Sequence, residues 1–147
     1  MHYIIASNGI VKDKVLIMKA ILLTMFMGFS FFGLCAQDNK FKTVDATEFA
    51  KVIENPEVVL LDVRTAEEHA DGYIPGTHYN LDVLKEDYEQ LATQTLPKEK
   101  PVALYCRSGN RSKNAARILA EQGYEVIELG TGFRGWVAAG MPVAKPE

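Results

Sequence analysis

The stretch of sequence that decides the fold is Leu104-Tyr105-Cys106-Arg107-Ser108-Gly109-Asn110-Arg111-Ser112. It begins inside the uninterrupted apolar run Val102–Tyr105, which is typical of a strand covered on both faces. A polar loop with a glycine follows, and a helical pattern starts at Ser112. A strand, a tight loop and a helix in this order place the cysteine at the carboxyl end of a strand, where open α/β sheets bind their ligands.

The loop after Cys106 has the composition of an anion-binding turn. Successive backbone N–H groups in such a turn converge on one point, and the positive end of the following helix adds to their field. Gly109 permits the unusual backbone angles that the turn needs, and Arg107 and Arg111 supply positive charge. These features all stabilise a thiolate, so we expect Cys106 to be a nucleophile. A buried core cysteine is the alternative.

Neither a metal nor another cofactor is expected at this cysteine. The chain has only two cysteines, and neither His69 nor His78 stands at ligand spacing from Cys106. We expect both histidines at surface or turn positions. The formal net charge of −3, without a basic cluster, gives no support for nucleic-acid binding.

On both sides of this stretch, short apolar runs alternate with helical patterns. This alternation predicts an α/β fold, doubly wound, with a mainly parallel five-stranded sheet and helices on both faces. The expected strands are 41–44, 58–61, 78–81, 102–105 and 126–129. The expected helices are one that starts after Asp45, one that starts after Thr65 and ends at Gly72, and three more at 82–93, 112–122 and 133–139.

Local signals mark several of these helices. Asp45 with Glu48, and Thr65 with Glu68, have the spacing of a capping box. Gly123 is expected to end the helix 112–122 in a left-handed conformation.

Two apolar patterns predict buried helix faces. Leu84, Tyr88 and Leu91 share one face of the segment 82–93, for which Asp82 is the expected cap. Trp136 lies on the inner face of the last helix, so we expect it in the core rather than at a substrate.

Three signatures resemble those of the single-domain rhodaneses, which are sulfurtransferases that carry sulfur as a cysteine persulfide. The loop 106–112 resembles the active-site loop of that family. Leu61-Asp62-Val63-Arg64, with the Glu67-Glu68 pair and 72–76 after it, is similar to the first family signature, and 130–136 with 140–143 is similar to the closing one. The signatures occur in the family's order and span almost the entire chain after Gln37, which implies a rhodanese-like fold.

Two departures from the family pattern leave the choice of substrate open. Tyr73 stands where the family often has histidine, and the link 77–80 is one residue longer than usual.

Four residues separate Cys106 from Arg111, whereas related tyrosine and dual-specificity phosphatases have five. The shorter loop favours a sulfur atom on the cysteine over a tetrahedral phosphate.

The resemblance implies a thiosulfate-type sulfurtransferase. Cys106 would take sulfane sulfur from a small anionic donor such as thiosulfate and pass it to a thiol or cyanide acceptor. A persulfide carrier that delivers sulfur to a protein partner is the main alternative. A phosphatase-like enzyme and a rhodanese fold without catalysis, used as an interaction domain, are weaker ones.

The residues expected to bind the substrate or the persulfide follow Cys106 directly: Arg107, Ser108, Gly109, Asn110, Arg111 and Ser112. Arg111 has two possible roles, attraction of an anionic donor or pairing with an acidic neighbour. In a supporting position, Asp62 is expected to order the loop backbone. Arg64 is expected to pair with Glu67 or Glu68.

The first 36 residues differ from the rest. No charged residue occurs from Ala20 to Ala36, a lysine precedes this apolar run, and a polar stretch starts at Gln37. A basic start, an apolar centre and a small residue before a polar stretch predict a secretory signal peptide. We expect cleavage after Ala36, with 37–147 as an exported rhodanese-like domain in the bacterial periplasm or cell envelope.

Other interpretations of this segment stay open. Met18 is a more natural start than Met1, so residues 1–17 are expected to be an upstream extension. A retained membrane anchor is an alternative, although the apolar run is at the short limit for a span. A lipid on Cys35 is another, and a membrane is expected as a partner only in these last two cases.

Overall fold

The computed structural model describes residues 41–146. They form the predicted fold, with a five-stranded, fully parallel sheet in the order β1-β5-β4-β2-β3. The strands are β1 (Lys42–Val44), β2 (Val59–Asp62), β3 (Tyr79–Asn80), β4 (Val102–Tyr105) and β5 (Val126–Leu129). The helices are α2 (Ala46–Ile53), α3 (Ala66–Ala70), α4 (Tyr88–Thr95), α5 (Asn110–Glu121) and α6 (Gly132–Ala138). The predicted signal segment lies outside the described residues.

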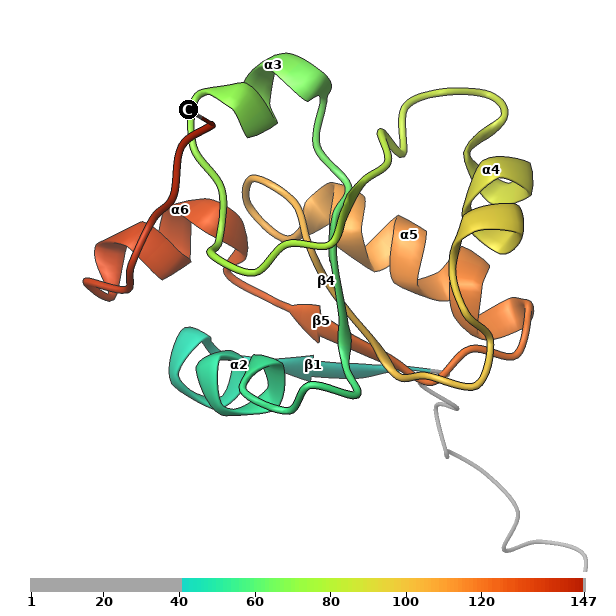
Figure 1. Ribbon diagram of the computed structural model, residues 1–147, viewed down its shortest axis with the longest axis horizontal. Coiled ribbons are helices and arrows are strands. Elements are labelled where there is room, and N and C mark those ends of the chain that lie inside the picture. The colour runs from blue at the N-terminus through green and yellow to red at the C-terminus, as the bar shows by residue number, and fades with distance from the viewer. Residues whose placement is uncertain (1–40, 147) are drawn as a thin grey trace, which may run out of the picture. The chain divides into compact units, whose positions relative to one another are not determined.

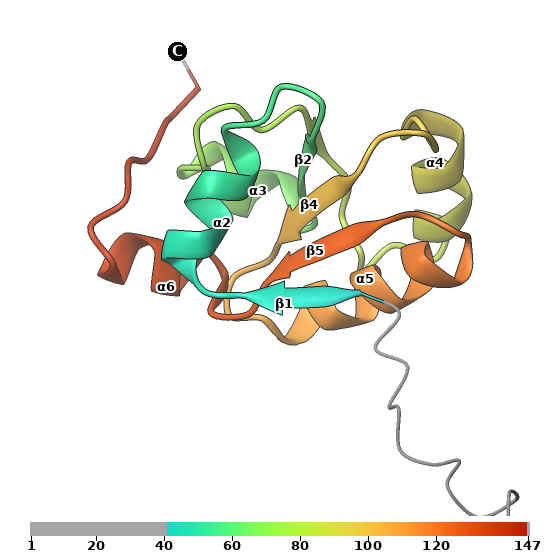
Figure 2. The same cartoon turned by 90° about the horizontal axis from the view of Figure 1, so that it is seen from below.

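Helices cover both faces of the sheet (Figures 1 and 2). On the face of α4 and α5, the core includes Val102, Leu104 and Cys106 of the central strand and its exit. On the face of α2 and α6, the core includes Ala103 and Tyr105 of the same strand. All four residues of β4 are buried, as its uninterrupted apolar pattern predicts. The strand therefore delivers Cys106 from the middle of the core.

The prediction of a helix over 82–93 is wrong in its first half. The helix α4 begins only at Tyr88, because the backbone before it forms turns: the N–H of Lys85 donates to the carbonyl of Asp82, and that of Tyr88 to the carbonyl of Lys85, both at 3.2 Å. The Asp82 carboxylate accepts from the N–H of Leu84 at 2.9 Å within the first of these turns. Leu84 is 64% exposed and Leu91 is 38% exposed, so the predicted apolar face is not a buried one. Tyr88 and Ala92 carry the contact with the core.

Of the two predicted capping boxes, one forms completely and the other only in its first half. Thr65 and Glu68 form the reciprocal box at α3. Asp45 accepts a hydrogen bond from the N–H of Glu48, but the Glu48 carboxylate binds Lys42 at 2.6 Å, so the second half of that box is not made.

The remaining boundaries move by small amounts. The third strand is only Tyr79–Asn80, α5 begins at Asn110, and Gly123 has the predicted left-handed conformation, with φ of 84°.

Trp136 is 2% exposed, which confirms its place in the core. No helix within residues 41–146 is long and apolar enough to cross a membrane.

Candidate active site

Cys106 lies directly after β4, at the carboxyl edge of the sheet, and is 1% exposed. Its Sγ accepts a hydrogen bond from the backbone N–H of Gly109 at 3.2 Å. Gly109 has φ of 94° and is the N-cap of α5, where no side chain caps the helix. The first N–H groups of a helix have no acceptor inside the helix. The loop therefore presents backbone donors and the positive end of α5 beside the sulfur.

The start of α6 fixes the direction of these donors. The N–H of Phe133 donates to the carbonyl of Cys106 at 2.8 Å, and the N–H of Arg134 donates to the carbonyl of Arg107 at 3.0 Å. In a trans peptide the N–H points opposite to the carbonyl. With both carbonyls bound by α6, the N–H groups of Arg107 and Ser108 are directed away from α6.

Two glycines allow the loop and the β5–α6 turn to come this close. A Cβ on Gly109 would lie 2.1 Å from the carbonyl oxygen of Gly130. A Cβ on Gly132 would lie 2.5 Å from the backbone nitrogen of Ser108. Since both glycines also have positive φ, no other residue fits either position without strain.

Ser112 connects the loop to a residue that the sequence analysis missed. Its hydroxyl lies 3.0 Å from the carbonyl oxygen of Gly109 and 2.6 Å from Oε1 of Glu128. Ser112 and Glu128 are both fully buried. The signal that could have found Glu128 is a single acidic residue inside the apolar run Val126–Leu129, at a position where the strand is covered.

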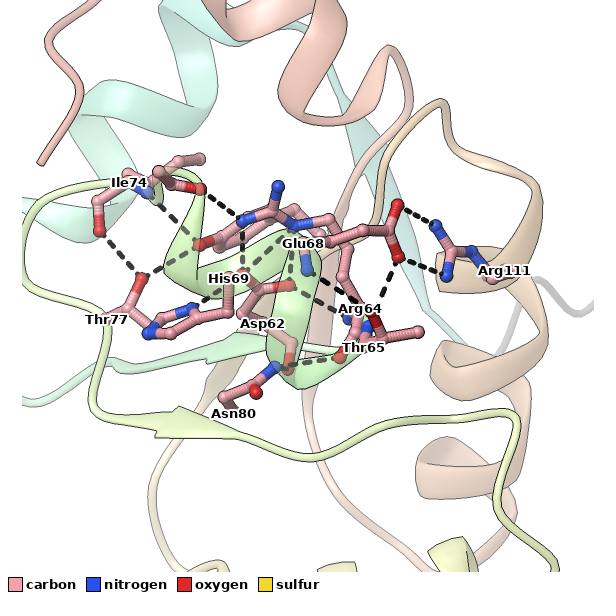
Figure 3. A network of polar contacts seen from close by, with 11 residues as sticks. Asp62, Arg64, Thr65, Glu68, His69, Ile74, Thr77, Asn80 and Arg111 are labelled. Carbon is pink, nitrogen blue, oxygen red and sulfur yellow. Dashed lines mark hydrogen bonds and ion pairs between the residues drawn. The ribbon is translucent and has the colours of Figure 1, made fainter. Parts of the chain in front are cut away.

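Arg111 is engaged by a carboxylate. Its Nη1 and Nη2 each lie 2.7 Å from an oxygen of Glu68 in a two-bond pair (Figure 3). The hydrogen bond from Arg111 lowers the pKa of Glu68, and the same bond raises the pKa of Arg111. Of the two expected roles for Arg111, the contact observed is the pairing with an acidic neighbour. Arg107, by contrast, is exposed, and no carboxylate within residues 41–146 forms an ion pair with it.

Arg64 does not pair with Glu67 or Glu68, so that prediction is wrong. Its Nη2 lies 2.6 Å from Oδ2 of Asp62 and 2.8 Å from the carbonyl oxygen of Gly72. Residues two apart at the end of a strand share a face, which is why Asp62 is the nearer partner. Asp62 also accepts a hydrogen bond from the backbone N–H of Arg64, as its expected ordering role requires.

Aromatic rings enclose the Arg64 guanidinium. Its Cζ lies 4.2 Å from the ring centroid of Phe133 and 5.4 Å from that of Tyr105, a cation–π arrangement. The Arg64 side chain is 4% exposed and that of Asp62 is fully buried. The pair therefore connects the end of β2 to Tyr105 of β4 and Phe133 of α6, and its charges are buried.

The two histidines have structural partners. His78 is exposed, as expected, and its Nδ1 accepts a hydrogen bond from the N–H of Leu60 at 3.0 Å. His69 was expected at a surface or turn position but lies in α3 and is half-buried. Its Nδ1 lies 2.9 Å from Oδ2 of Asp62 (Figure 3), and its ring stacks on that of Tyr73. Within residues 41–146, no group of three His, Cys, Asp or Glu side chains is placed to hold a metal ion.

A parallel α/β domain that presents a cysteine in an N–H-lined loop at its carboxyl edge is the class that the fold and the loop define. The sequence model of the rhodanese-like domain family matches residues 45–139 of this chain. The chain therefore belongs to the rhodanese-like family, as the resemblance in its sequence predicts.

Individual relatives agree with this membership. A protein named sulfurtransferase from Allochromatium vinosum is 35% identical over 98 residues, which are 66% of this chain and 88% of that protein. The thiosulfate sulfurtransferase GlpE of Tolumonas auensis is 31% identical over 100 residues, covering 67% of this chain and 90% of the relative. The solution structure of a rhodanese-like domain from Anabaena has a TM-score of 0.62 at 28% identity, covering 71% of this chain and 79% of the other.

Proposed function

We propose that this protein is a thiosulfate-type sulfurtransferase that works through a persulfide on Cys106. The observation that carries the proposal is the hydrogen bond from the Gly109 N–H to Cys106 Sγ, in a loop of four residues between Cys106 and Arg111. Donors at this position stabilise negative charge on sulfur. The curated relatives named as sulfurtransferases support the same class of reaction.

The reaction is a double displacement. The Cys106 thiolate attacks the outer sulfur of thiosulfate, an S–S bond forms, and the S–S bond of the donor breaks with its electron pair leaving on sulfite. The persulfide anion then lies among the N–H donors of the loop. A nucleophilic acceptor such as cyanide attacks the outer sulfur, thiocyanate leaves, and the Cys106 thiolate is restored.

The two arginines of the loop have different roles in the proposed reaction. Arg107 is exposed and has no described carboxylate partner, so it is available to attract an anionic donor. Arg111 holds Glu68 of α3 beside the start of α5 and acts mainly as a clamp. An anionic donor is therefore guided chiefly by Arg107 and the backbone donors, rather than by Arg111.

The test is thiosulfate:cyanide turnover, measured as thiocyanate release, together with the mass of the Cys106 peptide after incubation with thiosulfate alone. We expect turnover and a mass gain of one sulfur atom on Cys106. Cys106→Ser should lose both completely while keeping its fold, because a hydroxyl replaces the thiol at nearly the same size but forms no persulfide. Turnover that survives this substitution would overturn the proposed mechanism.

The same measurements separate the alternatives. A persulfide on Cys106 without thiocyanate release would indicate a carrier that needs a protein acceptor. Hydrolysis of an aryl phosphate faster than sulfur transfer would indicate a phosphatase and would contradict the argument from loop length. We expect no aryl phosphate hydrolysis by the wild-type protein.

We also propose that the protein is exported to the cell envelope. The support is the apolar segment that ends at Ala36, preceded by a lysine and followed by polar residues. N-terminal sequencing of the protein from its native host should find Gln37 as the first residue. A lipid on Cys35, or an intact segment, would contradict cleavage after Ala36.

A further inference from the structure

We infer that Glu128 and Ser112 are positioning residues that hold the donor loop in the geometry that faces Cys106. The inference rests on the proposed function, since it concerns how the same loop stabilises negative charge on sulfur. Neither side chain touches the sulfur. They act through the Gly109 backbone, which lies between them and Cys106.

A short chain of contacts carries the argument. Glu128 Oε1 lies 2.6 Å from the Ser112 hydroxyl, which lies 3.0 Å from the carbonyl oxygen of Gly109. The N–H of Gly109 in turn lies 3.2 Å from Cys106 Sγ. The Ser112 side chain and the Gly109 backbone therefore separate the Glu128 carboxyl group from the Cys106 sulfur.

Burial shows that this carboxyl group has no role as a surface charge. Glu128 is fully buried, and no ion pair joins it to any Lys, Arg or His among residues 41–146. Its Oε2 has no hydrogen-bond partner in the same part of the chain. Its neighbours across the sheet are Thr43 of β1 and Leu104 of β4.

A buried polar group without full pairing costs stability. An aliphatic residue at this strand position would avoid that cost. The gain that offsets it is the contact with Ser112, which is the only described side chain that forms a hydrogen bond with Glu128.

The consequence for the loop follows from peptide geometry. The Ser112 hydroxyl has one proton, so it donates to the Gly109 carbonyl when the Glu128 carboxyl group supplies the proton of the Glu128–Ser112 contact. The same carbonyl accepts from the N–H of Lys113 at 3.2 Å, and the N–H of Asn110 on this peptide therefore points the opposite way. Fixing this peptide also fixes the left-handed backbone of Gly109, whose own N–H is bound to the sulfur. Gly109 has no side chain of its own to restrain it, so the contacts of its carbonyl group with Ser112 and Lys113 restrain it instead.

The experiment is the pH profile of Cys106 alkylation by iodoacetamide in the full-length chain, followed on the Cys106 peptide by mass spectrometry. Glu128→Met keeps the side chain's length but removes the hydrogen bond. Ser112→Ala removes the other half of the link. We expect the midpoint of the profile to rise by about one pH unit in each variant, which is the effect of weakening a hydrogen bond to a charged group. Combining the two substitutions should add little, because they break the same link.

The rescue and control variants separate positioning from simple stability. Glu128→Gln retains a group that can bond Ser112, so its midpoint should lie closer to that of the wild type than that of Glu128→Met. Glu125→Gln makes the same side-chain replacement at an exposed position next to β5, and its midpoint should not move. Thermal melting of every variant shows whether a change in midpoint merely follows a loss of fold.

Two results would overturn the inference. One is a lower melting temperature with an unchanged alkylation midpoint in both Glu128→Met and Ser112→Ala, which would make the pair a core element only. The other is a fall of the midpoint in both Glu128→Met and Glu128→Gln, which would mean that a negative charge on Glu128 opposes the thiolate. Alkylation needs no sulfur donor, so these readings stand apart from a failure of thiosulfate turnover.

Discussion

The segments that leave β2 and β4 exit at the same edge of the sheet, yet they use their polar groups in opposite ways. After β2, the charged side chains are paired inside the protein. Asp62 contacts Arg64 and His69, and Arg64 also donates to the Gly72 carbonyl. After β4, Ser112 and α6 bind carbonyls of the loop, and the N–H of Gly109 donates to the sulfur.

The difference shows where a structural network ends and a site begins. Both segments contain an arginine and an ionisable side chain, so residue type alone does not separate them. What separates them is which groups remain unpaired after folding. The β2 exit is saturated with internal partners and gives rigidity, whereas the β4 exit keeps its backbone donors for a ligand.

The largest expected effect comes from breaking the saturated region. Asp62→Ala leaves the Arg64 guanidinium buried without its counter-ion, and we expect a loss of about 3–5 kcal/mol in the free energy of unfolding. Urea denaturation measures it. Asp71→Ala, at an exposed position directly after α3, is the control and should cost no more than about 0.5 kcal/mol. Equal effects of the two substitutions would contradict the structural role of Asp62.

A smaller but still large effect is expected in the donor loop. Gly109→Ala introduces a Cβ 2.1 Å from the Gly130 carbonyl oxygen, so the loop must move and the N–H of residue 109 leaves the sulfur. We expect kcat/KM for thiosulfate to fall by about a hundredfold or more, as when an oxyanion donor is removed.

A matched control separates strain from displacement of the donors. Gly76 has φ of 84° and open space around the position of a Cβ. Gly76→Ala therefore introduces backbone strain without the steric clash that Gly109→Ala adds. It should lower the melting temperature and leave kcat/KM near its original value. A similar loss of activity in both glycine variants would show that general instability, rather than loop geometry, is responsible.

The smallest effect is expected at the half-exposed Glu68–Arg111 pair. Arg111→Gln should lower the free energy of unfolding at pH 7 by at most about 1 kcal/mol. The hydrogen bond from Arg111 lowers the pKa of Glu68 in the folded chain, so the pair stabilises the fold above the unfolded value of about 4.3. This stabilisation is lost as the pH falls through the lowered pKa.

Denaturation of wild type and Arg111→Gln as a function of pH tests that sign. The difference between the two proteins should shrink from pH 5 downward and vanish in strong acid. A difference that persists there would mean that Arg111 stabilises the fold through a partner other than Glu68.

The sequence predicted the parts of the molecule that depend on local pattern. The parallel sheet follows from apolar runs such as Val102–Tyr105, and the place of Cys106 follows from a strand, a glycine-containing loop and a helix in succession. The family resemblance placed the chain among the rhodanese-like domains. The helix boundary at Asp82 was missed because a side chain that caps a helix also closes a turn, and the two outcomes have the same sequence signal.

Pairings between distant segments were harder to predict. Arg64 was expected to meet Glu67 or Glu68, and nothing in the sequence states that Glu68 faces Arg111 across the sheet edge instead. The contact of Glu128 with Ser112 joins β5 to α5, and only the completed fold brings them together. Such contacts depend on the register and packing of whole elements, which residue spacing does not encode.

The contacts of α6 with the loop have a consequence for how the protein is made. The carbonyls of Cys106 and Arg107 are oriented by Phe133 and Arg134, which belong to α6, the last helix within residues 41–146. Synthesis runs from the amino end, so the ribosome completes the cysteine before the residues that orient its loop exist. Because β5 also inserts between β1 and β4, the sheet itself is unfinished until then. The nascent loop therefore reaches its final orientation only when the segment through α6 has emerged and docked, and a chain that stops before α6 lacks the two contacts that orient the carbonyls beside the thiol.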